Sequence, residues 1–226
     1  MTILAFSAVG IFAYAIGVVD ALYTAKIINK SPDCKKKIKF NVWSIRTQVI
    51  AILNLLLWLI VVGTKGISII SISYMVIATC LLTLSVVDFA IYEIPFHINV
   101  IIGLAAIPTF INDFDIWYVH IIGAVCVSGL FWLFAVIKYR GQEMMGGGDV
   151  KLMIVAGFLL GWVKIILAMV IGCIIGSVIH CLRMVIDRKN EHVLAFGPYL
   201  SIAIFIMMII GNNIVNWYVS TFFGGI

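Results

Sequence analysis

Two aspartates, Asp88 and Asp149, stand beside apolar stretches and are the residues best suited to do chemistry. Asp88 closes the apolar run 81–87, and Asp149 follows three glycines at 146–148. A carboxylate beside an apolar segment is costly unless it faces protein, water or a partner. Two carboxyl groups a few Å apart do not both ionise easily, so one can activate water while the other holds a proton against a scissile carbonyl. The pair therefore suggests the catalytic dyad of an aspartic protease.

A structural role or an ion site is also compatible with these two aspartates. Asp149 could cap the helix that follows it, because a carboxylate is favoured near the N-terminal end of a helix, and Asp88 could be a charge at a membrane boundary. From a different class of protein, a transporter or channel could use both as an ion site. A transporter would want acids near the middle of the membrane. Asp88 and Asp149 are instead expected near the inner edge of the membrane, which favours a protease over a transporter.

The three glycines before Asp149 could also take part in substrate binding. A glycine run is often a flexible turn, but a backbone without Cβ atoms also lets an extended substrate approach closely and pair with the main chain. On the second interpretation Gly148 tolerates a side chain least, because a methyl group there would obstruct substrate or force an unfavourable dihedral angle. Gly147 is expected to be more tolerant.

The elements that position these residues must lie in a membrane. Of the 226 residues, 64% are hydrophobic and only 11% are charged, whereas a soluble domain is about a quarter charged. The net charge of +5 comes from short basic clusters between apolar runs, without the basic face interleaved with aromatics that nucleic-acid binding would need. We therefore expect an all-α membrane protein with no nucleic-acid partner, in which one domain fills residues 1–226.

Hydropathy predicts about eight transmembrane helices, because a helix needs about 20 apolar residues to cross the bilayer. The sixth is short, and Gly161 and Trp162 separate it from the seventh by a tight turn. The apolar start is interpreted as a retained span rather than a cleaved leader, with Asp20 near its inner end. The predicted segments are roughly 3–22, 48–64, 67–87, 95–111, 116–137, 151–162, 164–182 and 199–222.

The basic residues indicate the orientation. If loops alternate sides, all of the 15 Lys and Arg residues except Lys65 and Lys164 fall on one side. The positive-inside rule makes that side cytoplasmic, so both termini are expected outside, with both aspartates at the cytoplasmic boundary. The first basic loop, residues 23–47, holds only Cys34, and the five cysteines form no CxxC pair. We therefore expect no metal site, and we expect no cofactor.

Three short motifs follow one another along the chain. The stretch from Asp88 to Pro95 ends in Ile-Pro, residues 142–153 read Gln-Glu-Met-Met-Gly-Gly-Gly-Asp-Val-Lys-Leu-Met, and residues 196–198 read Phe-Gly-Pro. In this order they resemble the type IV prepilin peptidases, membrane aspartic proteases of the GxGD type, whose second catalytic segment typically reads M-G-x-G-D-x-K-L. The resemblance covers roughly residues 41–222.

This resemblance implies an aspartic endopeptidase that removes the basic leader of type IV prepilins or pseudopilins at the cytoplasmic face of the cell membrane. Two related kinds of GxGD protease stay open as alternatives, the preflagellin peptidases and the signal-peptide-peptidase-like enzymes. The implied catalytic residues are Asp88 and Asp149, and the implied substrate-positioning residues are Gly146, Gly147, Gly148, Lys151 and Pro95.

Two features depart from the family pattern. Asp88 is followed by the turn 89–92, Phe-Ala-Ile-Tyr, which is more apolar than the usual basic turn, and Phe96 stands where Asn or Asp is common. The loop 23–47 lacks the two CxxC pairs of many bacterial members, a zinc site associated with N-methylation of the new amino terminus. The chain therefore resembles a protease without that zinc module, and the residues leave open whether it also methylates.

Overall fold

The computed structural model describes residues 3–31, 41–139, 142–143, 146–186 and 195–222. Almost all of these residues are helical, apart from short connections and one small antiparallel hairpin in which Lys138 pairs with Glu143. The elements are α1 (Ile3–Lys30), α2 (Ile45–Lys65), α3 (Ile69–Ile91), α4 (Phe96–Asn112), the 3-10 turn η1 (Phe114–Ile116), α5 (Trp117–Val136), β1 (Lys138–Tyr139), β2 (Gln142–Glu143), α6 (Gly147–Leu160), α7 (Trp162–Ile186) and α8 (Gly197–Phe222).

Six of the eight described helices, α1, α2, α3, α5, α7 and α8, are long and apolar enough to cross a membrane. α4 has 17 residues and α6 only 14. At about 1.5 Å per residue, α6 measures roughly 21 Å, less than the roughly 30 Å of a hydrocarbon core. The prediction of an all-α, multi-pass membrane protein is confirmed, and the sixth helix is the short one, as expected.

The boundary between α6 and α7 also follows the prediction. α6 ends at Leu160, and α7 begins at Trp162. Gly161 between them has a φ of +76°, a conformation that residues with a Cβ atom rarely adopt. One glycine therefore turns the chain between two helices.

Two helix ends near the aspartates differ from the prediction. α1 continues to Lys30 instead of ending near residue 22, so the connection predicted as 23–47 is reduced to 31–44. α6 begins at Gly147 rather than at 151, which places Asp149 inside its first turn. Hydropathy detects the most apolar part of a helix. The last two turns of α1 mix polar residues with the buried Ile28, which packs with Val87 and Ile91 of α3, and the first turn of α6 is glycine-rich.

Asp20 lies well inside α1 rather than near its inner end, because that helix extends to Lys30. The Oδ1 atom of Asp20 accepts a hydrogen bond from the hydroxyl of Thr83 in α3. A side chain at the end of a span would reach toward water, whereas this one faces a neighbouring helix. The expectation of a helix-end carboxylate is therefore wrong.

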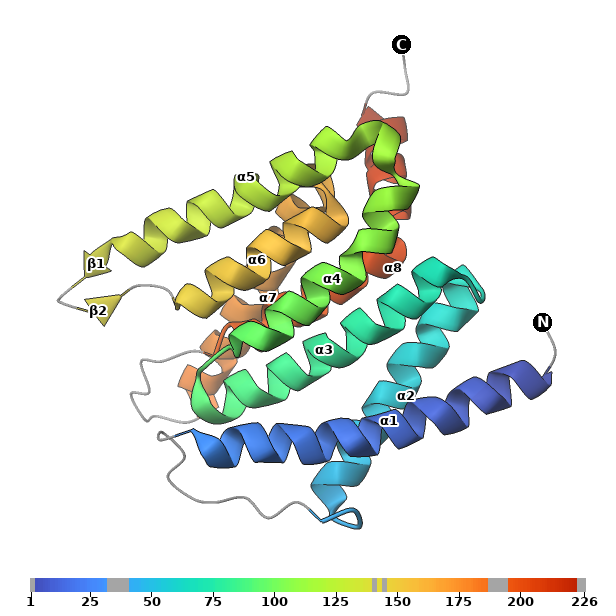
Figure 1. The fold of residues 1–226 in the computed structure, drawn as a ribbon. Helices are drawn as coiled ribbons and strands as arrows, with labels where there is room; N and C mark the ends of the chain where they lie inside the picture. Colours follow the sequence, from blue (N-terminus) through green and yellow to red (C-terminus); the bar gives the residue numbers. More distant parts are fainter. Residues whose placement is uncertain (1–2, 32–40, 140–141, 144–145, 187–194, 223–226) are drawn as a thin grey trace.

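The helices form a bundle in which α3 and α4 lie beside each other, α5 packs on α6, and α1 crosses next to α2 (Figure 1). The C-terminal ends of α1 and α3 and the N-terminal ends of α4 and α6 all lie at the left of this view, together with β1 and β2. The main core is made of buried apolar side chains from α3 to α8, such as Leu84, Ile102, Phe131, Met153, Ile165 and Leu200.

α5 and α6 come very close where two glycines meet. A Cβ atom on Gly157 would lie 2.1 Å from the carbonyl oxygen of Gly123, and one on Gly123 would lie 2.5 Å from the carbonyl oxygen of Gly157. Small residues allow membrane helices to approach in this way and gain van der Waals contact. His120 adds a hydrogen bond, in which Nδ1 donates to the carbonyl oxygen of Phe158 at 2.7 Å. These contacts fix α6, the helix that carries Asp149.

Polar side chains join α1, α2 and α3. The amide nitrogen of Asn54 donates to the carbonyl oxygen of Ala13 at 2.9 Å, and its amide oxygen accepts from Thr79 Oγ1 at 2.8 Å. Trp58 Nε1 donates to the same Thr79 hydroxyl at 3.0 Å. Hydrogen bonds of this kind hold helices together where apolar surface alone gives no preference over lipid. They attach α1 and α2 to α3, the helix that carries Asp88.

Candidate active site

Both aspartates line one cavity of about 520 Å³ at the end of the bundle where α3 ends and α6 begins. They come from helices far apart in sequence, and the packing of α4 against both α3 and α6 brings them to the same cavity. All the other residues predicted to form the site line the same cavity. These are Gly146, Gly147, Gly148, Lys151 and Pro95, and they are joined there by Ile27, Lys30, Ser31, Ile91, Tyr92, Glu93, Ile94 and His97.

Asp88 is held at the end of α3 by the way that helix stops. Its backbone carbonyl accepts from the N–H of Tyr92 at 2.8 Å, and Tyr92 takes a left-handed conformation with φ of 56°. Pro95 then precedes the first residue of α4 with φ of −64°, a geometry for which proline is preorganised. The chain therefore reverses within a few residues, and the Asp88 side chain is left buried, with 5% of its surface exposed.

Asp149 is placed by the glycines before it. Gly146 has an extended backbone, with φ of −68° and ψ of 134°, and its carbonyl accepts from the N–H of Asp149 at 3.1 Å. Gly146 and Gly147 are exposed, and a Cβ atom on Gly147 would meet nothing within 4 Å. The glycine run therefore presents open main chain next to a carboxyl group whose Oδ1 atom is buried and has no hydrogen-bond partner among the described residues.

Gly148 is crowded for a different reason from the one expected. It lies within α6 and its φ is not positive, so the expected dihedral strain is absent. A Cβ atom there would instead lie 2.7 Å from Cβ and 3.2 Å from Cγ1 of Ile94. Gly148 thus lets the start of α6 pack against the turn that follows Asp88, and it sets the distance between the two segments that carry the aspartates.

Gly197, which begins α8, is a site residue that sequence reasoning missed. Its backbone N–H donates to Asp88 Oδ2 at 2.9 Å, across 109 residues of sequence. The Phe-Gly-Pro motif at 196–198 gave a signal that this position matters, but no local pattern indicated which side chain it would meet. The structure therefore adds a backbone donor from a third helix to the two aspartates.

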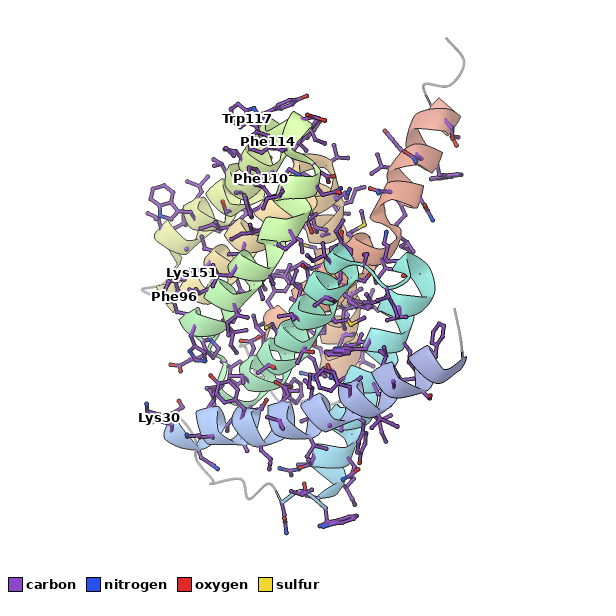
Figure 2. All side chains as sticks on the ribbon, turned by 45° about the vertical axis from the view of Figure 1, so that its right-hand side comes forward. Lys30, Phe96, Phe110, Phe114, Trp117 and Lys151 are labelled. Atoms are coloured by element: carbon purple, nitrogen blue, oxygen red, sulfur yellow. The ribbon has the colours of Figure 1, made fainter. Side chains whose placement is uncertain are left out.

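The cavity also has charged groups at its edge. The Lys151 ammonium lies over the ring of Phe96, 5.2 Å from its centroid, a cation–π arrangement. His97 packs edge-on against Tyr23, with ring centroids 6.1 Å apart. Figure 2 shows Phe96 and Lys151 next to each other, with Lys30 below them and Phe110, Phe114 and Trp117 above them in this view.

Possible metal ligands are not clustered in the part of the chain that the structure describes. Among the described residues, no three His, Cys, Asp or Glu side chains gather closely enough to hold an ion. Cys34 and the rest of residues 32–40 lie outside the described residues, as does the side chain of Glu143. The arrangement that the structure does describe is two carboxyl groups, a backbone donor and open main chain around one cavity, which is suited to acid–base chemistry on a polar bond.

Comparison with known proteins gives one consistent answer. Residues 75–181 match the type IV leader peptidase family. The chain is 35% identical over 103 residues to a prepilin leader peptidase/N-methyltransferase of Aeromonas salmonicida, covering 44% of this chain and 34% of that protein.

Longer matches are found to proteins of the same name. The Pseudomonas putida protein is 30% identical over 191 residues, 80% of this chain and 62% of the relative, and the Bacillus subtilis protein is 27% identical over 161 residues, 70% and 64% respectively. The chain thus spans only part of the length of these relatives, about a third in the Aeromonas match. No solved structure matches the chain.

The region matched by the family model runs from α3 into α7 and contains Asp88, the glycine run and Asp149. These segments also build the cavity described above. Residues 75–181 of the chain belong to the type IV leader peptidase family.

Proposed function

We propose that this protein is a membrane aspartic endopeptidase that removes the basic leader of type IV prepilins or pseudopilins at the cytoplasmic boundary of the cell membrane. Asp88 and Asp149 are its catalytic residues. The single observation that carries the proposal is that these two carboxyl groups, from α3 and α6, line one cavity. Two carboxyl groups so placed favour a state that holds one proton between them, which is the state an aspartic protease uses.

The open main chain beside Asp149 supports a peptide substrate. Gly146 and Gly147 are exposed and line the cavity, so an extended peptide can reach the carboxyl group and pair with backbone groups there. Pro95 and Lys151 line the same cavity and complete the substrate-positioning set. The scissile bond would lie between the glycine run and the turn after α3.

The placement of the cavity supports cleavage near the membrane surface. It lies where α1 ends and α6 begins, with Lys30 and Lys151 in its lining. In a prepilin the basic leader would stay in the cytoplasm and the following apolar helix would lie in lipid, so the bond between them would come to this depth. We further propose that residues 1–226 act as one membrane protease domain, without a bound metal or cofactor, and with both termini outside.

The experiment that tests this function is leader removal from a model prepilin co-expressed with variants of the full chain. Asp88→Asn and Asp149→Asn should each lower processing by at least about a thousandfold, because an amide cannot take or share the proton. Asp115→Asn is the matched control, since Asp115 is exposed in η1. Normal processing by either dyad variant at equal membrane abundance would refute the proposal.

A further inference from the structure

The two aspartates of the cavity differ in their hydrogen bonding. Asp88 Oδ2 accepts from the N–H of Gly197 at 2.9 Å in a buried setting. Gly197 is the first residue of the 26-residue helix α8, and the N-terminal end of a helix carries partial positive charge and unpaired N–H groups that favour an anion. Pro198 has no N–H, and that of Tyr199 already bonds to the carbonyl of Phe196. Gly197 therefore directs its N–H to Asp88 without a competing donor beside it.

Only glycine allows this approach. A Cβ atom at position 197 would lie 2.8 Å from Asp88 Oδ2 and 3.1 Å from its Cγ, and 3.2 Å from Cδ2 of Leu84. Any side chain here would push the carboxyl group away from the N–H that it accepts. The Gly197 backbone and the Asp88 carboxylate are therefore fitted to each other.

Asp149 has no comparable donor. Its Oδ1 atom is buried and receives no hydrogen bond from the described residues. Asp149 also lies in the first turn of a helix, but no N–H of that turn donates to its buried Oδ1 atom. A buried carboxylate oxygen without a donor is unfavourable, whereas a protonated carboxyl group can itself donate.

The other ionisable groups do not remove this difference. Those lining the cavity are Lys30 from α1, Tyr92 and Glu93 from the turn after α3, His97 from α4 and Lys151 from α6. Lys151 is placed over Phe96, and α8 contributes a backbone donor but no ionisable side chain to the cavity lining. The direct hydrogen bond from Gly197 is thus the feature that separates Asp88 from Asp149.

From this asymmetry we propose that Asp88 is the ionised member of the dyad and the general base, that Asp149 holds the proton, and that Gly197 is the residue that positions and ionises Asp88. This assignment rests on the proposed function. In the first step the water oxygen bonds to the carbonyl carbon, the water proton passes to Asp88, and the Asp149 proton passes to the carbonyl oxygen.

The second step returns both aspartates to their starting states. The carbon–nitrogen bond breaks, and the leaving nitrogen takes the proton from Asp88. One hydroxyl of the tetrahedral intermediate gives its proton back to Asp149 as the new carboxylic acid forms. The net reaction is addition of one water across the peptide bond, with no oxidant, reductant or metal required.

The test compares the titration of each carboxyl group when the other is an amide. Purified full chain carrying isotope-labelled aspartate is titrated by infrared or NMR spectroscopy, and the signal of interest is identified as the one lost in the double Asn variant. The protonation midpoint of Asp88 is measured in the Asp149→Asn protein, and that of Asp149 in the Asp88→Asn protein. We expect the Asp88 midpoint to lie about one to two pH units below the Asp149 midpoint. Titration in the reverse order, or at the same pH, would overturn the assignment.

A glycine variant tests the role of the backbone donor. Gly197→Ala, made in the Asp149→Asn protein, should raise the protonation midpoint of Asp88 by about one pH unit or more. Gly172→Ala is the control, since its Cβ atom would meet Cδ2 of Leu200 at 3.1 Å near the start of α8 without meeting Asp88. An unchanged Asp88 midpoint in a folded Gly197→Ala protein would overturn the role of Gly197.

The readouts separate this inference from the function on which it rests. If both single Asn variants lose cleavage but the two carboxyl groups titrate in the reverse order, the proposed protease function is supported and the assignment of Asp88 as base and Asp149 as acid is refuted. If either Asn variant cleaves normally, the proposal that both aspartates are catalytic is refuted, whatever the titration shows.

Discussion

Gly148 in the first turn of α6 packs directly against Ile94 in the turn after α3, where an added Cβ atom would lie 2.7 Å from the Ile94 Cβ. This contact joins the two segments that carry Asp88 and Asp149. Both contact atoms are close to the backbone, so neither can swing aside as the end of a long side chain would. The separation of the aspartates therefore depends on a glycine at this position.

We predict that Gly148→Ala harms cleavage more than Gly147→Ala. The methyl group at 148 should push α6 away from Ile94 and separate the aspartates, and a displacement of about 1 Å can cost roughly a hundredfold in rate. A methyl group at 147 meets nothing within 4 Å. The measurement is the processed fraction of a model prepilin at matched membrane abundance. Equal activities, or a worse Gly147 variant, would mean that the glycine run is only a hinge.

We predict that Gly157→Ala destabilises the protein, because its Cβ atom would lie 2.1 Å from the Gly123 carbonyl oxygen. Overpacking of this kind typically costs about 1–3 kcal/mol. Gly129→Ala is the matched control in α5, since nothing lies within 4 Å of its added Cβ atom. Thermal unfolding in detergent measures both variants, and an unchanged midpoint for Gly157→Ala would contradict close packing of α5 on α6.

We predict that Asn54→Leu weakens the attachment of α1 and α2 to α3. It removes the bonds to the Ala13 carbonyl and the Thr79 hydroxyl, and such interhelical bonds are each worth about 0.6–2 kcal/mol. Thr64→Val is the control, because the exposed Thr64 hydroxyl bonds only within its own helix. The unfolding midpoint should fall for the Asn54 variant alone. A similar loss in both would mean that the interhelical bonds contribute nothing of their own.

We predict that chelators leave leader cleavage intact. The proposed chemistry uses two carboxyl groups and water, and the chain has no cysteine pair with the spacing of a zinc site. Processing by purified protein should be the same with and without EDTA or phenanthroline, measured beside a zinc protease that both reagents inhibit. Loss of cleavage that added zinc restores would contradict the prediction.

The sequence by itself determined the class of protein and the segments that carry the site. Membrane helices are local features, set by runs of apolar residues, so the eight helices and the break at Gly161 followed from composition along the chain, although only six of the described helices are long enough to cross a membrane. Asp88 and Asp149 could also be selected as candidate catalytic residues from local sequence features. Each is an acid at the end of an apolar run, and the glycines before Asp149 mark where main chain can be approached.

Helix ends were predicted less well, for a physical reason. The last turns of α1 and the first turn of α6 are helical because of backbone hydrogen bonds and packing, while hydropathy registers only apolar surface. The extension of α1 is what brings Lys30 to the cavity, and the earlier start of α6 is what puts Asp149 inside a helix. Neither result could be obtained from the apolar pattern.

Only the tertiary structure decided what surrounds each aspartate. The N–H of Gly197 reaches Asp88 across 109 residues, and Gly148 contacts Ile94 rather than open space. Such contacts depend on the crossing of α3, α6 and α8, which is set by close packing of small residues and by side-chain hydrogen bonds between helices. The sequence determined that two carboxyl groups were available. The packing of helices decided that Asp88 has a backbone donor, while no described residue donates to the buried Oδ1 atom of Asp149.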